Sequence, residues 1–180
     1  MTKSRIAFLL AATGTAAAAT AQSSPPPPPP PACTSPEHRQ FDFWVGDWDV
    51  YRTGTDTLAG RNRIENIYGG CTIRENWMSV RGSGGGSLNM YDPVDKRWHQ
   101  TWQDGSNARV EFDGGLSDGK MILMGYWHGV GGPGKDALVR MVYTPNADGT
   151  VRHLGEQSTD HGLTWTPGWD LTYKPRRAAN

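Results

Sequence analysis

Short apolar segments separated by turn residues fill the chain from Phe41 to Tyr173, and this pattern constrains the fold more than any other feature. Almost no stretch keeps the 3.6-residue apolar repeat of a helix, whereas boundaries of Gly, Asp, Asn and Pro are typical of short strands. Only residues 36–46 are expected to form a short helical turn. The pattern predicts ten strands, at residues 48–52, 60–67, 72–80, 87–91, 97–103, 109–113, 120–127, 138–143, 151–158 and 164–173.

Turn residues join these strands closely. Gly69-Gly70, Asp118-Gly119 and Asp148-Gly149 can adopt the positive φ angles that tight hairpins require. Strands joined in order by short turns form a meander, and a long meander curls because its edges would otherwise be exposed. The sequence therefore predicts an all-β fold, in which an up-and-down antiparallel meander closes into a barrel of about ten strands.

The beginning of the chain has the pattern of a secretory signal. Lys3 and Arg5 precede an apolar, alanine-rich run that ends in the small-x-small sequence Ala19-Thr20-Ala21. The run is shorter than the roughly 20 apolar residues that cross a bilayer as a helix. We expect residues 1–21 to be a signal peptide, with no membrane span after its removal and with export to the periplasm or the cell exterior.

Composition divides the rest of the chain. Residues 22–35 include seven consecutive prolines, which predict a stiff polyproline II spacer about 20 Å long. Residues 36–175 are expected to form one domain, and residues 176–180 a basic tail. Cys33 and Cys71 are an even pair in a chain expected to be exported, so we predict that they form a disulfide.

The charge balance bears on the class of partner. The chain has 18 basic and 18 acidic side chains. A balanced chain lacks the positive field that binds nucleic acid, so no nucleic-acid partner is expected.

The sequence Gly46-Asp47-Trp48 opens the first predicted strand directly after the helical turn. This G-x-W, in front of a ten-strand meander, resembles the calycin superfamily of lipocalins, fatty-acid-binding proteins and nitrobindin-like barrels. The resemblance implies that Trp48 packs inside the closed end of the barrel, near a basic side chain of the last strand, for which Lys174 and Arg176 are the candidates.

Three longer stretches, GGCTIRENW, GGSLNMYDPVDKRWHQTW and GEQSTDHGLTW, resemble a group of exported bacterial proteins of uncharacterised function that are classed as lipocalin-like. This resemblance covers nearly all of residues 38–174. It implies a fold and no established activity.

The stretch STDHGLTW, residues 158–165, matches the Asp-box pattern S-x-D-x-G-x-T-W. In sialidase-like propellers this motif is a hairpin without a catalytic role, and a propeller needs several copies where this chain has one. We expect a turn in which Asp160 caps the backbone, Gly162 supplies the special conformation and Trp165 packs beneath.

Two glycine-rich stretches are expected to be loops. GVGGPG, residues 129–134, matches G-x-G-x-x-G, but Pro133 and the strand pattern that follows exclude the helix that a nucleotide site requires. GSGGGS, residues 82–87, is expected to be a loop on the same grounds, and it lacks the G-x-S-x-G frame of a nucleophilic serine.

The histidines show no paired metal spacing such as H-x-H or H-E-x-x-H. We therefore expect no metal site and no cofactor. Haem held by a single axial ligand, as in the nitrobindin-like barrels, would need one inward-facing histidine, and His128 and His153 are the candidates.

Alternation along three consecutive strands brings aromatic and polar side chains to one wall of the barrel. This mixture is typical of a small-molecule pocket, although simple core packing uses the same residue types. A carboxyl group buried in this wall would either form an ion pair, with Arg63 or Arg140, or have a raised pKa. The wall consists of Glu75, Trp77, Asn89, Tyr91, Trp98, Gln100 and Trp102.

Three functions are compatible with this wall. The first is binding of a small, partly apolar ligand by an exported barrel. The second is an isomerase or lyase type of enzyme, with Glu75 as general acid or base and Tyr91 polarising the substrate. The third is a structural envelope protein whose barrel is filled by its aromatic side chains.

Overall fold

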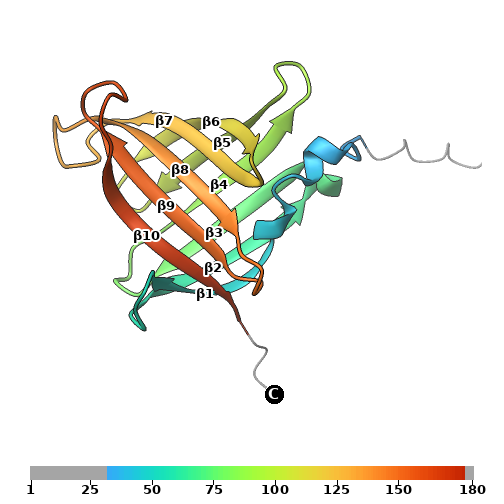
Figure 1. Cartoon of the computed structure of the whole chain (residues 1–180), viewed down its shortest axis with the longest axis horizontal. Coiled ribbons are helices and arrows are strands. Elements are labelled where there is room, and N and C mark those ends of the chain that lie inside the picture. The colour runs from blue at the N-terminus through green and yellow to red at the C-terminus, as the bar shows by residue number, and fades with distance from the viewer. Residues whose placement is uncertain (1–31, 177–180) are drawn as a thin grey trace, which may run out of the picture. The chain divides into compact units, whose positions relative to one another are not determined.

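Ten antiparallel strands form a closed barrel in the computed structural model, which describes residues 32–176 (Figure 1). Each strand pairs with its neighbours in sequence, and β1 pairs with β10 to close the barrel, which confirms the predicted all-β meander. The strands are β1 (Gly46–Arg52), β2 (Leu58–Ile67), β3 (Thr72–Ser79), β4 (Gly84–Asp92), β5 (Arg97–Asp104), β6 (Arg109–Ser117), β7 (Lys120–Trp127), β8 (Ala137–Pro145), β9 (Val151–Ser158) and β10 (Thr166–Pro175).

Three short 3-10 helices accompany the strands: η1 (Pro36–Arg39), η2 (Asp42–Trp44) and η3 (Tyr68–Gly70). The first two correspond to the predicted helical turn before β1. No helix within residues 32–176 is long and apolar enough to cross a membrane. The predicted signal peptide, the proline run and the last four residues of the predicted tail lie outside the described residues.

The predicted loop at residues 82–87 is wrong from residue 84 onward, because β4 begins at Gly84. Gly85 and Gly86 pair with Trp77 and Asn76 of β3. A Cβ atom on Gly86 would lie 2.5 Å from the carbonyl oxygen of Glu75. These glycines therefore permit a close strand approach, a role that a cluster of turn residues does not reveal.

The segment that contains η1 and η2 covers the end of the barrel where the β8–β9 hairpin turns (Figure 1). Phe41 and Trp44 are fully buried there, with ring centroids 4.9 Å apart in a stacked arrangement. The Phe41 ring also meets the edge of Tyr143 at 5.0 Å. Trp98 Nε1 donates a hydrogen bond to Gln40 Oε1 at 3.1 Å. We call this end of the barrel the closed end.

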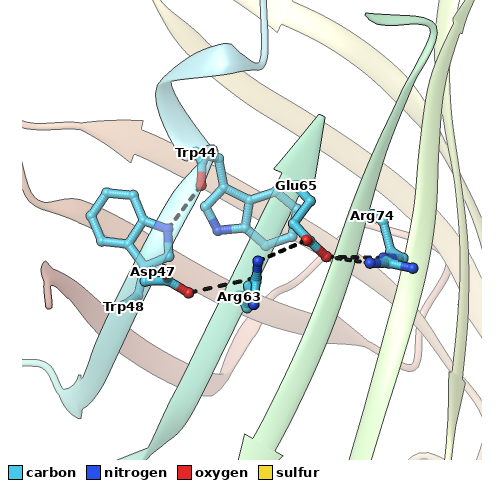
Figure 2. Close-up of polar contacts among 6 residues, drawn as sticks. All are labelled: Trp44, Asp47, Trp48, Arg63, Glu65 and Arg74. Atoms are coloured by element: carbon cyan, nitrogen blue, oxygen red, sulfur yellow. Dashed lines mark hydrogen bonds and ion pairs between the residues drawn. The ribbon is translucent and has the colours of Figure 1, made fainter. Parts of the chain in front are cut away.

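Trp48 is buried at the closed end, and its Nε1 donates to the Trp44 carbonyl oxygen at 2.9 Å (Figure 2). The basic neighbour implied by the calycin resemblance is absent from the described last strand. Lys174 points outward, with Nζ 4.6 Å from the centroid of the Tyr51 ring, and Arg176 is exposed. Alternation along β10 turns Tyr173 inward instead, 6.1 Å from the Trp48 ring.

The outer face of the same strands carries a row of alternating charges (Figure 2). Arg63 lies 3.9 Å from the Asp47 carboxylate and 3.1 Å from that of Glu65. Arg74 Nε donates to Glu65 at 3.1 Å, and the bond from Arg74 is the main cause of the lowered pKa of Glu65. The charged side chains of these strands therefore face solvent, whereas the apolar ones at alternate positions face inward.

Cys33 and Cys71 form a disulfide, with Cα atoms 5.0 Å apart, as predicted. The bond joins the N-terminal segment to the residue directly before β3. The guanidinium of Arg39 also donates to the carbonyl oxygen of Gly70. A covalent bond and a polar contact therefore hold the segment that closes the barrel.

The Asp-box stretch forms the turn between β9 and β10. Asp160 accepts hydrogen bonds from the Thr164 backbone nitrogen at 2.9 Å and the Thr164 hydroxyl at 2.6 Å. These bonds, with the hydroxyl first, lower the pKa of Asp160 to about 2. Gly162 has a φ of 89°, and Trp165 Nε1 donates to its carbonyl oxygen at 3.1 Å.

Candidate functional site

A cavity of about 200 Å³ occupies the barrel interior on the side away from the closed end. Its wall is mostly apolar, with a small set of polar side chains on β3, β5, β8, β9 and β10. Four partly exposed tryptophans from four different strands form its outer part, whereas Trp44, Trp48 and Trp98 at the closed end are buried. The cavity is lined by Glu75, Trp77, Gln100, Trp102, Phe112, Trp127, Met141, Tyr143, His153, Trp169, Leu171 and Tyr173.

Glycines on neighbouring strands make room for three of the four tryptophans. A Cβ atom on Gly60 would lie 2.6 Å from Cη2 of Trp77, and one on Gly85 would lie 2.6 Å from Cζ2 of Trp102. Gly155, which is paired with Trp169, faces the Trp169 ring in the same way. The indole rings therefore lie flat against the barrel wall where a larger neighbour would push them into the cavity.

Glu75 is the only carboxyl group among the residues that line this cavity, and it is 7% exposed. Its Oε1 accepts a hydrogen bond from Asn62 Nδ2 at 2.7 Å, and its Oε2 accepts one from the Ser87 hydroxyl at 2.7 Å. Both donors are neutral. Burial raises the pKa of Glu75 to about 7, and the two hydrogen bonds offset part of that rise.

The predicted ion pair of Glu75 with an arginine does not form. Arg63 faces outward and pairs with Asp47 and Glu65, and Arg140 donates to Glu156 at 2.8 Å and 3.0 Å on the outer face. Alternation explains the outcome, because both arginines lie on strand positions of the opposite parity to the inward-facing ones. The other predicted possibility, a raised pKa, applies instead.

Hydrogen bonds extend from Glu75 to β5. Asn89 Nδ2 donates to the Ser87 hydroxyl at 2.9 Å and to the Ile73 carbonyl at 3.1 Å. Gln100 Nε2 then donates to Asn89 Oδ1 at 2.6 Å. Every step of this chain donates toward Glu75, so the network supports a negative charge on its carboxyl group.

His153 is another polar side chain of the cavity wall, next to the Tyr173 hydroxyl that Asn62 also contacts. Its Nε2 accepts a hydrogen bond from Trp169 Nε1 at 3.2 Å, and its Nδ1 lies 3.5 Å from the Tyr173 hydroxyl. The imidazole stacks on Tyr143, with centroids 4.1 Å apart. Burial lowers the pKa of His153 to about 3, so the ring is neutral near pH 7.

Both histidines named as possible haem ligands are engaged by protein groups. The two ring nitrogens of His153 face Trp169 and Tyr173, and this leaves no free nitrogen for an iron. His128 is exposed, and its Nδ1 lies 2.8 Å from Asp136. His128 also lies outside the cavity lining, whereas His153 faces the cavity with both ring nitrogens next to protein groups.

Asp92, Asp95 and His99 gather on the β4–β5 hairpin, with ligand atoms close enough to surround a metal ion. His99, however, already lies between two carboxylates, 2.9 Å from Asp95 and 2.6 Å from Asp113. Partial burial alone would lower the pKa of His99, but the hydrogen bonds that its ring donates to these two carboxylates outweigh burial and raise it. The cluster therefore has the character of a charged hairpin contact.

Four of the seven residues of the predicted wall line the cavity: Glu75, Trp77, Gln100 and Trp102. Asn89 lies behind them in the hydrogen-bond network. Tyr91 and Trp98 instead pack with the N-terminal segment at the closed end, where His38 meets the edge of the Tyr91 ring at 5.3 Å. The predicted acid–base pair of Glu75 and Tyr91 is therefore not assembled around the cavity.

Eight residues of the cavity wall were missed in the predicted pocket wall, and all lie on β6 to β10. Of these eight, only His153 was named as a candidate site residue, as a possible haem ligand. Alternation alone would have placed each of them inward, but it gives no depth along the barrel. The glycine opposite an aromatic residue is the signal that marks Trp169, because Gly155 has no side chain to pack beside it. The missed residues are Phe112, Trp127, Met141, Tyr143, His153, Trp169, Leu171 and Tyr173.

The raised pKa of Glu75 predicts a dependence of stability on pH. The native carboxyl keeps its proton up to about pH 7 and an unfolded one only to about 4.5, so native stability falls as the pH rises through this window. The full cost is about 3 kcal/mol above pH 7. Glu75→Gln removes it, and we expect the variant to gain about 3 kcal/mol relative to wild type between pH 4 and pH 8.

Urea unfolding of both proteins at the two pH values measures this difference directly. His153 and the other titrating groups are common to both proteins and cancel. A stability difference that stays constant between pH 4 and pH 8 would show that Glu75 titrates normally.

The site combines a partly open cavity with aromatic walls and one buried carboxyl group, whose hydrogen-bond partners are all neutral. Its function has to be inferred from this chemistry, because the chain matches no known family model and no curated protein with which it was compared.

Proposed function

We propose that this protein is an exported binding protein that holds a small, partly apolar molecule inside its barrel. The cavity carries the proposal, because a barrel filled by its own side chains would leave no such volume. Its aromatic walls supply apolar contact area, and Glu75, Gln100, Tyr143, His153 and Tyr173 supply polar groups that would orient a ligand.

The size of the cavity limits the ligand. A dry apolar cavity of about 150 Å³ is enough to hold benzene, and this one measures about 200 Å³. Pockets for drug-sized molecules usually measure about 300–1,000 Å³. The ligand would therefore be about one ring with a short substituent.

Export is supported by the disulfide between Cys33 and Cys71. Structural disulfides persist in oxidising compartments and are rare in the cytosol of mesophiles. This agrees with the secretory pattern of residues 1–21.

Ligand binding should change the tryptophan emission, because four indole rings line the cavity. A panel of single-ring probes, neutral, cationic and anionic, together with short fatty acids, should contain compounds that quench or shift the fluorescence. A probe that binds the folded protein, at a free concentration of 100 times its Kd, would add about 2.7 kcal/mol to the free energy of unfolding and raise the Tm.

Two tryptophan variants test whether the change in emission comes from the cavity. Trp102→Phe should lose part of the ligand-induced change, whereas Trp165→Phe should keep it, because Trp165 lies in the β9–β10 turn outside the cavity lining. A panel that leaves both the emission and the Tm unchanged would contradict a binding function.

A further inference from the structure

The Glu75 carboxylate in the cavity has no positively charged partner among the described residues. Glu75 forms no ion pair, and no lysine or arginine lies in the cavity wall described for residues 32–176. The other titratable side chains that face the cavity are His153, Tyr143 and Tyr173. All three are neutral near pH 7, because burial lowers the pKa of the histidine and raises those of the tyrosines.

An oxygen without a hydrogen-bond donor lies beside this carboxyl group, on the side chain of Asn62. Asn62 uses its amide nitrogen to donate to Glu75 and, at 3.3 Å, to the Tyr173 hydroxyl. Its Oδ1 is buried and accepts no hydrogen bond. The region around Glu75 is therefore electronegative, and its neutral donors leave part of that charge uncompensated.

The indole rings of the cavity wall also favour a positively charged ligand. Four tryptophans, Trp77, Trp102, Trp127 and Trp169, line the cavity that also exposes Glu75. Tryptophan presents the most electron-rich face of the aromatic side chains, and a cation close to such faces is attracted to them. A carboxylate together with several indole rings is a combination that binds ammonium groups.

We propose that the cavity selects a small organic cation, an ammonium ion with one ring or a comparable apolar group, whose charged nitrogen lies at Glu75 and whose apolar part contacts the tryptophans. This inference rests on the proposed binding function. An anionic ligand of the same size would be repelled by Glu75, and a neutral one would leave its charge unpaired.

Three probes of similar size test the charge preference: 2-phenylethylamine, 2-phenylethanol and phenylacetate. At pH 8 the amine is protonated and Glu75 is mainly ionised, since its pKa is about 7. Calorimetric titration of the full protein should show the amine binding at least about tenfold more tightly than the alcohol, with the acid weakest.

Substitution of Glu75 should remove this preference. In Glu75→Gln the affinity for the amine should fall by about tenfold, and that for the alcohol should change less than about twofold. Glu156→Gln is the matched control, because it removes the same charge from the outer face, where Glu156 pairs with Arg140. The control should bind the amine as wild type does.

The pH profile of the wild-type protein is a second test that needs no variant. Glu75 gains a proton as the pH falls below about 7, so the affinity for the amine should decrease by about tenfold between pH 8 and pH 5.5. The affinity for the alcohol should stay constant over this range.

The outcomes separate the two proposals. If the alcohol or the acid binds best, and Glu75→Gln changes nothing, the cation preference is overturned and the binding function stands. If none of the three probes binds and the wider fluorescence panel is also silent, the binding function itself fails.

Discussion

Truncation of Trp44 to alanine should lower the free energy of unfolding by about 3–5 kcal/mol, one of the two largest effects expected in this protein. Trp44 is fully buried, stacked on Phe41 and 4.9 Å from the ring of Tyr143. Its loss would leave a void between the N-terminal segment and the strands. Since small domains have about 5–15 kcal/mol in total, this is a large part of the stability.

Trp44→Phe is the matched control. The indole Nε1 of Trp44 is buried without a hydrogen-bond partner, so phenylalanine removes an unsatisfied donor while keeping most of the ring. Its loss of stability should be well below that of the alanine variant. Urea unfolding followed by far-ultraviolet circular dichroism measures both. An alanine variant within about 1 kcal/mol of wild type would show that the segment does not contribute to the core.

Loss of the disulfide should have a comparable effect. The bond links residues separated by 38 positions, and the chain-entropy relation for a loop of that size gives about 4 kcal/mol of stabilisation. We expect the double variant Cys33→Ser, Cys71→Ser to lose about this amount, with the end of the barrel near η1 opening first, because the bond tethers that segment.

A reducing agent gives the control for this experiment. It should lower the urea midpoint of the wild-type protein to that of the double variant and leave the variant itself unchanged. Equal midpoints for the oxidised wild type and the variant would mean that the bond contributes no net stability.

Much of the fold could be predicted because the strand signal is local. Alternation between inner and outer residues needs only a few consecutive positions, and hairpin turns such as Asp118-Gly119 carry their own conformational preference, with φ values of 49° and 73° in the structure. The glycines at 84–86 were misassigned because the same residue permits a turn and a close strand contact. Only the partner strand, here β3, distinguishes these roles.

The residues of the site were harder to predict, because alternation shows which face of a strand a side chain lies on but not how deep in the barrel it lies. Trp98 and Trp102 share a face of β5, yet Trp98 follows a hairpin at the closed end and Trp102 lies near the opposite end. For the same reason Tyr91 was predicted in the cavity wall but packs at the closed end. Tyr143 and Tyr173 come near Glu75 only through the closure of β10 on β1, and no local pattern encodes that proximity.

The pairing of the first strand with the last also determines when the cavity comes into existence. Val50 is paired with Tyr173, so the walls on both sides of Glu75 meet only after almost the whole chain is available. A chain released residue by residue, as in synthesis or translocation, has no intermediate length at which the interior is enclosed. Closure of the barrel is therefore completed late and depends on a distant strand pairing, which makes folding slow compared with that of a helical protein of this size.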